Sequence, residues 1–148
     1  MTAQTSKDLA QAIYERFNAN DFDGVLAYAA DDWRGVAYHA GAEFSGKDGF
    51  REFMQGFKGA FPDCTVTLTH QVLAGDELVN EFSWVGTHTG PLPTPAGAIP
   101  ASGRTVRSVA VEVWRLRDGK LVELRNYQDG VAILAQIGAL PLPEPAGL

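Results

Sequence analysis

The feature that most constrains the fold is a change of hydrophobic period at Cys64. Before it, apolar residues such as Leu9, Ile13 and Phe17 recur at the spacing of one helix face. After it, segments rich in Val, Thr, Trp and Phe alternate with a period of two, as in β-strands. Helices followed by a run of strands indicate an α+β domain, in which one face of an antiparallel sheet is covered.

Three helices are predicted before the change of period. The first covers residues 6–19, because Asn18 to Asp21 end its apolar pattern. A shorter helix covers residues 23–30. The third begins at Ser45-Gly46-Lys47-Asp48, which has the pattern of a capping box, and it ends before Pro62.

Four strands and a last helix are predicted after the change of period at Cys64. Gly75-Asp76 and Asp118-Gly119 are typical of hairpin turns, so the strands should follow one another as an antiparallel meander. The last helix covers residues 129–137, with Asp129 as its N-cap and Gly138 after its end. The predicted strands are Thr65–Ala74, Glu77–Thr87, Arg104–Leu116 and Lys120–Tyr127.

Length and charge exclude several classes of protein. The chain has 148 residues, so we expect one domain at 1–140, followed by a Pro-rich C-terminal tail at 141–148. Its net charge of −6 argues against a nucleic-acid or anionic-membrane partner, because phosphate groups bind to a positive field. No apolar run approaches the ~20 residues that span a bilayer. Residues 1–20 also lack the pattern of a signal peptide, so we expect a cytoplasmic location.

The sequence offers no pattern for a cofactor or a metal. Cys64 is the only cysteine, and His39 and His70 have no partner at ligand spacing. The turn Gly86–Gly90 lacks the lysine of a phosphate-binding loop and leads into proline instead of a helix. We therefore expect neither a metal site nor a cofactor.

A bent sheet packed on the N-terminal helix is expected to leave a hollow at its centre. An apolar, aromatic hollow suits a flat organic ligand better than a sugar or a phosphate. Plain core packing is the alternative for each candidate, and it is the preferred interpretation for Phe50 and Phe53. The candidates to line the hollow are Phe17, Trp33, Met54, Phe57, Phe82, Trp84 and Trp114.

Alternation along the last two predicted strands places Glu112 on one face of the sheet but does not place Asn126. On the strand Arg104–Leu116, alternation puts Glu112 and Trp114 on one face together with Ser108 and Ala110. The other face carries Val109, Val111 and Val113. We expect the valine face to contact the core, which leaves Glu112 on the open side. Neither face of the next strand is purely apolar, so parity does not place Asn126 inside.

Five short segments, in their order and spacing, resemble the SnoaL-like polyketide cyclases. The resemblance covers nearly the whole chain and implies a cone-shaped α+β barrel of the nuclear-transport-factor-like superfold with a central pocket. It also implies ring closure of an anthracycline precursor by intramolecular aldol condensation, in which an Asp of the last strand takes a proton from carbon. No metal or cofactor takes part in that reaction. The segments are Phe17-Asn18, Phe61-Pro62-Asp63, Gly86-Thr87-His88-Thr89-Gly90, Asp118-Gly119-Lys120-Leu121 and Gln136-Ile137-Gly138.

The resemblance also implies where the site residues fall. The catalytic Asp of the family falls on Asn126, and the pocket His that assists it falls on Glu112. The aromatic residue that flanks the substrate falls on Phe17, the His of the glycine-flanked turn on His88, and the aromatic residue after the catalytic Asp on Tyr127. The scaffold therefore matches the family, and the acid/base pair does not.

The change at Asn126 alters the chemistry that can be expected. An amide does not accept a proton in the physiological pH range, but it can donate a hydrogen bond to an enolate oxygen. Glu112 would then be the base, with its pKa raised by burial beside Trp114. In the alternative, Glu112 pairs with a neighbouring arginine and Asn126 is a plain pocket amide. His88 lies between glycines, where we expect the backbone to expose it.

Three functions remain open from the sequence. The first is an enzyme of the cyclase, isomerase or lyase kind, in which Glu112, Asn126 and His88 act on a hydrophobic carbonyl compound. The second is a non-catalytic module that binds an apolar small molecule. The third is a scaffold domain whose open sheet face forms a homodimer, with the tail 141–148 as an arm. The first two predict an internal cavity, and the third predicts a filled interior. An open sheet face also predicts a homodimer for the first two.

Overall fold

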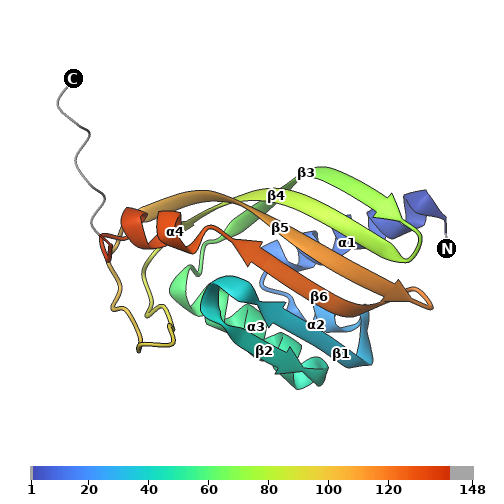
Figure 1. Ribbon diagram of the computed structural model, residues 1–148, viewed down its shortest axis with the longest axis horizontal. Helices are drawn as coiled ribbons and strands as arrows, with labels where there is room; N and C mark the ends of the chain where they lie inside the picture. The colour runs from blue at the N-terminus through green and yellow to red at the C-terminus, as the bar shows by residue number, and fades with distance from the viewer. Residues whose placement is uncertain (1, 141–148) are drawn as a thin grey trace.

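The computed structural model describes residues 2–140, which form four α-helices and one curled sheet (Figure 1). The Pro-rich tail predicted at 141–148 lies outside the described residues. None of the helices in residues 2–140 has both the length and the apolar character needed to cross a bilayer.

The sheet has six strands in the order β2-β1-β6-β5-β4-β3. The four strands expected after Cys64 form the predicted antiparallel meander, and β1 joins it by pairing parallel to β6. Because β2 and β3 are the two edges, the sheet curls without closing. The strands are β1 (Ala29–Ala37), β2 (Ala42–Ser45), β3 (Thr65–Ala74), β4 (Glu77–Thr87), β5 (Thr105–Arg117) and β6 (Lys120–Gln128).

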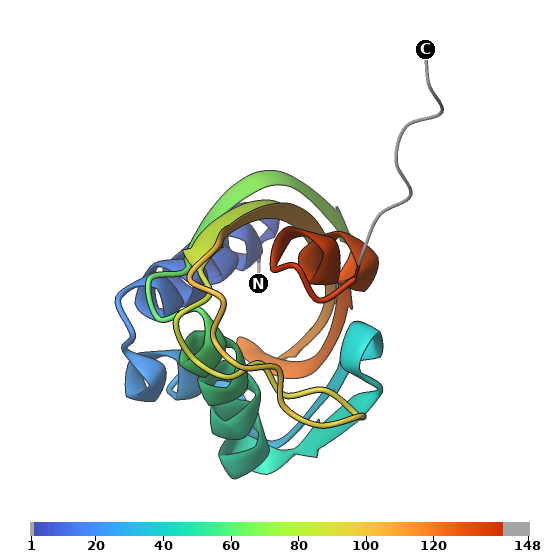
Figure 2. The ribbon, with the colours of Figure 1, turned by 90° about the vertical axis from the view of Figure 1, so that its left-hand side faces the viewer.

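The helices close the open side of the curl. Figure 2 shows the sheet wrapped around one side of the molecule, with α1 and α3 on the other. Helix α3 packs on β1 and β2, and α1 packs on β3. This arrangement confirms the predicted α+β fold with a strongly bent sheet. The helices are α1 (Ala3–Asn18), α2 (Phe22–Leu26), α3 (Gly46–Ala60) and α4 (Gly130–Gln136), with a short 3-10 turn, η1 (Tyr38–Ala40), between β1 and β2.

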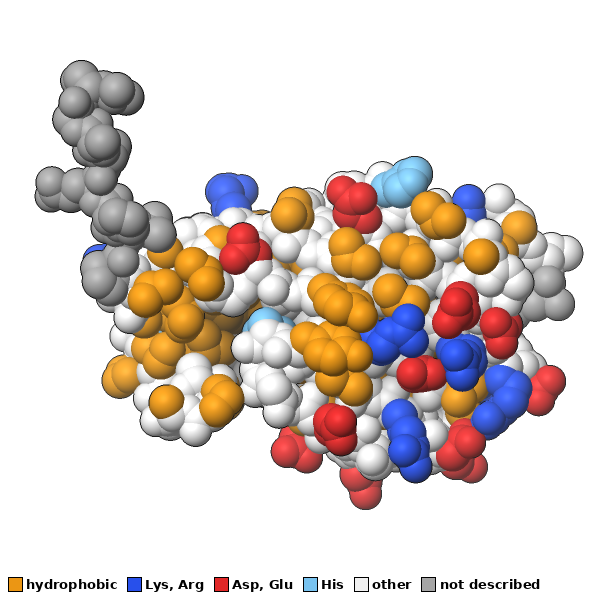
Figure 3. All heavy atoms as spheres, viewed as in Figure 1, with side chains coloured by type: hydrophobic (Ala, Val, Ile, Leu, Met, Phe, Trp, Pro, Cys, Tyr) orange, Lys and Arg blue, Asp and Glu red, His pale blue; other side chains and the backbone are white. Residues whose placement is uncertain are grey.

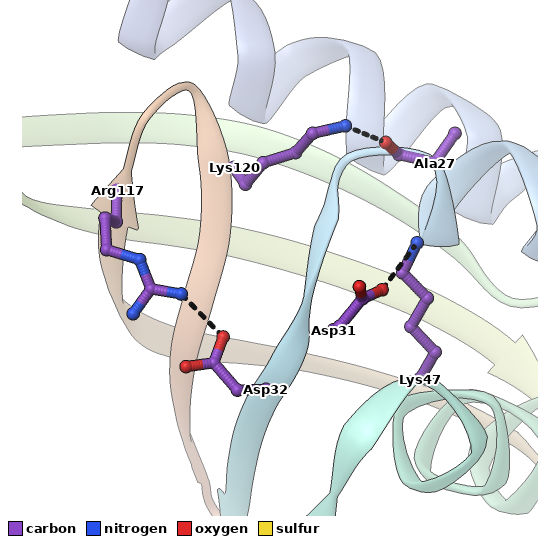
Figure 4. A network of polar contacts seen from close by, with 6 residues as sticks. All are labelled: Ala27, Asp31, Asp32, Lys47, Arg117 and Lys120. Carbon is purple, nitrogen blue, oxygen red and sulfur yellow. Dashed lines mark hydrogen bonds and ion pairs between the residues drawn. The ribbon is translucent and has the colours of Figure 1, made fainter.

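The first two strands were not predicted from the sequence. The helix expected over 23–30 ends at Leu26, and the chain enters β1 at Ala29. Asp31 and Asp32 interrupt the apolar pattern of β1, so the sequence does not show the alternation typical of a strand there. In the structure both carboxylates are exposed and form ion pairs, with Asp32 2.6 Å from Arg117 and Asp31 3.7 Å from Lys47 (Figure 4). Exposed pairs contribute only about 0–1 kcal/mol each, so they add little to the stability of β1.

The predicted helix caps have different outcomes. Asp129 accepts a hydrogen bond from the amide of Ala132 at 2.9 Å, which confirms it as the N-cap of α4. Ser45 stands at the N-cap position of α3, but its side chain makes no capping bond. The next residue, Gly46, has a left-handed φ of 71°, so the chain does not enter α3 with the geometry of a capping box.

Val109, Val111 and Val113 of β5 lie on the opposite side of the sheet from the one expected. Even-numbered residues of β5 point into the curl, and Val109, Val111 and Val113 point out, with Val109 64% exposed. The expectation that the valine face contacts the core is therefore wrong. β-Branched residues suit either face of a strand, whereas the large aromatic residues fill the concave side. Glu112 thus points to the inside of the curl.

Candidate active site

A cavity of about 710 Å³ lies inside the curl. The concave sheet face, α1 and α3 line its walls, and residues of η1, β2 and the β4–β5 loop (residues 88–104) also contribute. Its lining is mainly aromatic and apolar, which is typical of sites for flat organic ligands. It includes the following predicted site residues: Phe17, Met54, Phe57, Trp84, Glu112, Trp114 and Asn126.

Glu112 is the central polar residue of this cavity, at 5% exposure. Its Oε1 accepts hydrogen bonds from the Tyr14 hydroxyl at 2.6 Å and from Trp114 Nε1 at 3.2 Å. Its Oε2 accepts one from Asn126 Nδ2 at 2.8 Å. Burial raises the pKa of Glu112, and these three donors partly oppose that rise. The ion pairs formed within residues 2–140 do not include Glu112, so the alternative of a salt bridge to arginine is wrong.

Tyr14 is a site residue that the sequence analysis did not select. Its ring stacks on Trp114 with centroids 5.2 Å apart and lies 5.4 Å from Phe82. Burial and the neighbouring Glu112 raise the pKa of Tyr14 well above its ordinary value, so its hydroxyl remains a donor. Its signal in the sequence was its position three residues before Phe17, on the same helix face.

Asn126 reaches the cavity because of a β-bulge. Arg115 pairs with Glu123 and Leu116 pairs with Leu121, so Val122 is an extra residue in β6. Beyond it, Asn126 points inward, which the alternation along the strand alone could not establish. The Oδ1 atom of Asn126 is buried and has no hydrogen-bond partner within residues 2–140.

Trp33 and Tyr127 do not line the cavity. Trp33 is 0% exposed and stacks on Phe50 at 4.2 Å with an interplanar angle of 9°, so it belongs to the core. Tyr127 is 43% exposed on the outer face and packs on Tyr38. Trp33 and Tyr127 were predicted to contact substrate, and the structure places them elsewhere.

His88 is buried, at 0% exposure, so the expectation that the turn exposes it is wrong. Its Nδ1 accepts a hydrogen bond from the Ser102 amide at 3.1 Å and lies 2.9 Å from Ser102 Oγ. The flanking glycine Gly90 allows close packing, because a Cβ there would clash with the carbonyl oxygen of Gly59 in α3. His88 therefore fixes the base of the β4–β5 loop and does not line the cavity.

The rim of the cavity carries polar residues from elements that the sequence analysis missed. His39 in η1 and Glu43 in β2 line it, as do Glu52 and Gln55 of α3. Because β1 and β2 were not predicted, nothing in the sequence placed His39 near Asn126. No cluster of three or more His, Cys, Asp or Glu side chains in residues 2–140 could hold a metal ion.

The bond from Tyr14 to Glu112 leads to a prediction on pH dependence. Burial raises the pKa of Glu112 in the folded protein above its value in the unfolded chain. The contribution of Glu112 to stability is therefore fully present below its unfolded pKa, and it is lost as the pH rises through its folded pKa. Tyr14→Phe removes a donor that lowers this pKa, so the loss should extend to higher pH and deepen by about 1–3 kcal/mol. Urea unfolding measured from pH 4 to pH 9 checks this result.

A double variant provides the control for Tyr14→Phe. In a Glu112→Gln background no carboxylate remains at this position, so adding Tyr14→Phe should leave the pH dependence unchanged. A pH-dependent effect of Tyr14→Phe in that background would show that another group is responsible.

The whole fold resembles several solved structures. TsrD from Streptomyces laurentii superposes with a TM-score of 0.82 at 22% identity, covering 95% of this chain and 99% of that one. AclR, a candidate hydroxylase from Streptomyces galilaeus, gives a TM-score of 0.80 at 23% identity, covering 97% and 91%. IdmH, a candidate polyketide cyclase from Streptomyces antibioticus, gives a TM-score of 0.73 at 26% identity, covering 89% of this chain and 97% of that one.

Comparison at the level of sequence gives a consistent result. A search of curated proteins finds no significant match. The family model of the SnoaL-like polyketide cyclases matches residues 7–137, which is almost the whole of the described chain. The chain therefore belongs to the SnoaL-like polyketide cyclase family.

Proposed function

We propose that the cavity binds a flat, hydrophobic carbonyl compound and takes a proton from the carbon next to its carbonyl group. The observation that carries this proposal is Glu112, a carboxylate of raised pKa inside an aromatic cavity whose lining contains no lysine or arginine within residues 2–140. A carboxylate whose pKa lies nearer neutrality is a better proton acceptor than an ordinary one. Cyclase, isomerase and lyase reactions of such compounds share this first step.

Glu112 Oε2 is the proton acceptor in this proposal. It receives one hydrogen bond, from Asn126, whereas Oε1 receives two, so Oε2 keeps a free lone pair. The C–H bond of the ligand breaks, its proton passes to Oε2, and its electron pair forms an enolate. The second N–H of Asn126 donates to the enolate oxygen, as an oxyanion-hole donor does.

The apolar lining holds the ligand in this proposal. Phe17, Met54, Phe57, Trp84 and Trp114 contact the ring system of the ligand, and the stack of Tyr14 on Trp114 keeps the carboxylate oriented. Trp33, Tyr127 and His88 take no part, because they lie outside the cavity lining.

Deuterium exchange tests the first step without knowledge of the natural substrate. β-Tetralone is a flat aromatic ketone with an acidic CH₂ group, and its exchange in D₂O is followed by proton NMR. We expect the protein to accelerate exchange at least about 100-fold over buffer, in the range of general-base catalysis. Exchange at the buffer rate in the presence of saturating protein would contradict the proposal.

A non-catalytic ligand-binding module is the second candidate. It is favoured by the three hydrogen bonds that already engage Glu112 and by the amide at Asn126. A rise in melting temperature with β-tetralone but no exchange would support it. The scaffold interpretation predicted a filled interior, which the cavity of about 710 Å³ does not fit.

The proposal includes a homodimer formed through the outer sheet face. Figure 3 shows apolar side chains spread across the outer face of β3 to β6, and the exposed ones include Val72, Val109 and Tyr127. In a two-fold dimer each such residue enters the interface twice. Val109→Glu should weaken the dimer by roughly 100-fold, because an unpaired carboxylate would be buried on each subunit.

Light scattering coupled to size exclusion measures this change as a shift from dimer to monomer. Ala98→Glu, in the exposed part of the β4–β5 loop, adds the same charge away from the sheet and should leave the dimer intact. A wild-type monomer at high micromolar concentration would contradict the dimer.

A further inference from the structure

We infer that His39 is a third catalytic residue of the cavity, which donates a hydrogen bond to the oxygen of the carbonyl group whose carbon the enolate attacks. This inference rests on the proposed function. It concerns the step in which the carbon–carbon bond forms, whereas Glu112 and Asn126 serve the step before it.

The fold places His39 in the lining of the same cavity as the proposed base. Strand β1 runs parallel to β6, and Ala37, its last residue, pairs with Asn126. The η1 turn carries the chain two residues further, and His39 there lines the same cavity as Glu112 and Asn126. Ala37 and His39 are thus brought to the same end of the sheet as Asn126, from which they are far apart in the sequence.

The turn that carries His39 is held on both sides. Outside the sheet, the ring of Tyr38 packs on Tyr127 with centroids 4.8 Å apart. On the other side, the first residue of α4, Gly130, faces the Cβ of His39, and a side chain at Gly130 would contact it. Gly41 ends the turn with a left-handed φ of 60°, which glycine adopts without strain. These contacts position His39 at the rim of the cavity.

The imidazole has donor capacity that the protein does not use. Within residues 2–140 its ring nitrogens make no hydrogen bond. His39 is exposed to solvent as a residue, and partial desolvation of its ring lowers its pKa, which favours the neutral ring with one N–H at pH 7. A neutral imidazole can polarise a carbonyl group in this way.

Glu112 and His39 would act in successive steps of an aldol reaction. Glu112 Oε2 takes the proton from carbon, and the enolate carbon then forms a bond to the second carbonyl carbon. The π electrons of that carbonyl move onto its oxygen, where the N–H of His39 stabilises the alkoxide. The alkoxide takes a proton from water at the rim, and Glu112 releases its proton to solvent.

The reverse reaction provides an assay, because both directions share one transition state. A naphthyl β-hydroxyketone releases a fluorescent naphthaldehyde and acetone when its carbon–carbon bond breaks. We expect His39→Leu to lower this cleavage about 100-fold more than it lowers exchange of β-tetralone, which is the effect of one lost oxyanion donor. His39→Gln keeps an N–H at the rim and should retain cleavage within about tenfold of wild type.

The controls separate this inference from the proposed function. His70→Leu, at an exposed position of β3, should change neither reaction, and equal melting temperatures would show that the His39 variants are folded. Exchange by wild type without cleavage, or equal cleavage by His39→Leu, would overturn the role of His39 and leave Glu112 in place. Absence of both reactions in wild type would overturn the proposed function and, with it, this inference.

Discussion

Glu112→Gln should lower the rate of β-tetralone exchange by about 1,000-fold, within the usual range for loss of a general base. An amide has nearly the same shape as the carboxylate but does not accept a proton at neutral pH. Asn126 can turn its amide so that its unpartnered Oδ1 accepts a hydrogen bond from the new side chain. The variant should therefore fold normally, and the lost rate reports on chemistry.

Stability should change in the opposite sense to activity. A carboxyl whose pKa is raised in the folded state costs stability once the pH exceeds its unfolded pKa. Glu112→Gln removes that cost, so the variant should be at least as stable as wild type at pH 8 and less dependent on pH. The exchange rate of wild type should rise with pH through the pKa of Glu112.

Glu81→Gln is the matched control for this experiment. Glu81 lies exposed on the outer side of β4, so its substitution should leave the exchange rate unchanged. If Glu112→Gln kept its rate within tenfold of wild type, Glu112 would no longer be a candidate for the base.

Trp33→Ala should lower the free energy of unfolding by about 3–5 kcal/mol, the usual cost of truncating a large buried aromatic residue. The Trp33 ring is fully buried and stacks on Phe50 of α3. It also lies so close to Gly35 that a Cβ there would clash with it. Since small domains have total stabilities of about 5–15 kcal/mol, this single change should remove much of the margin.

Urea unfolding measures the loss, and Trp33→Phe is the control. The smaller ring keeps an aromatic partner for Phe50, so its cost should be clearly lower than that of Trp33→Ala. Because Trp33 does not line the cavity, Trp33→Phe should bind β-tetralone as wild type does. A loss of binding with unchanged stability would show instead that Trp33 contacts the substrate, as predicted from the sequence.

The sequence predicted those parts of the fold that local patterns encode. The helices α1 and α3 and the four strands after Cys64 repeat an apolar period over nine residues or more, and their bounds agree closely with prediction. Strand β1 has no such period, because Asp31 and Asp32 stand in its middle and it is fixed by parallel pairing with distant β6. Pairing between distant segments leaves no mark on local alternation.

The candidate site was limited by two further effects. The extra residue Val122 shifts the parity of β6, so the inward direction of Asn126 could not be read from alternation. The glycines around His88 were interpreted as a sign of exposure, although Gly90 serves close packing on α3. The roles assigned to Glu112 and Asn126 stay predictions until the exchange experiments are done.

The hydrogen bond between Tyr14 and Glu112 joins residues 98 positions apart. Closing so long a loop carries an entropic cost that local turns avoid, and contacts of this kind slow folding. The hairpins of β3 to β6 can form from neighbouring segments, but the cavity exists only after α1 has docked on them. A chain whose sheet has formed and whose first helix is still free would therefore have most of its secondary structure and no functional site.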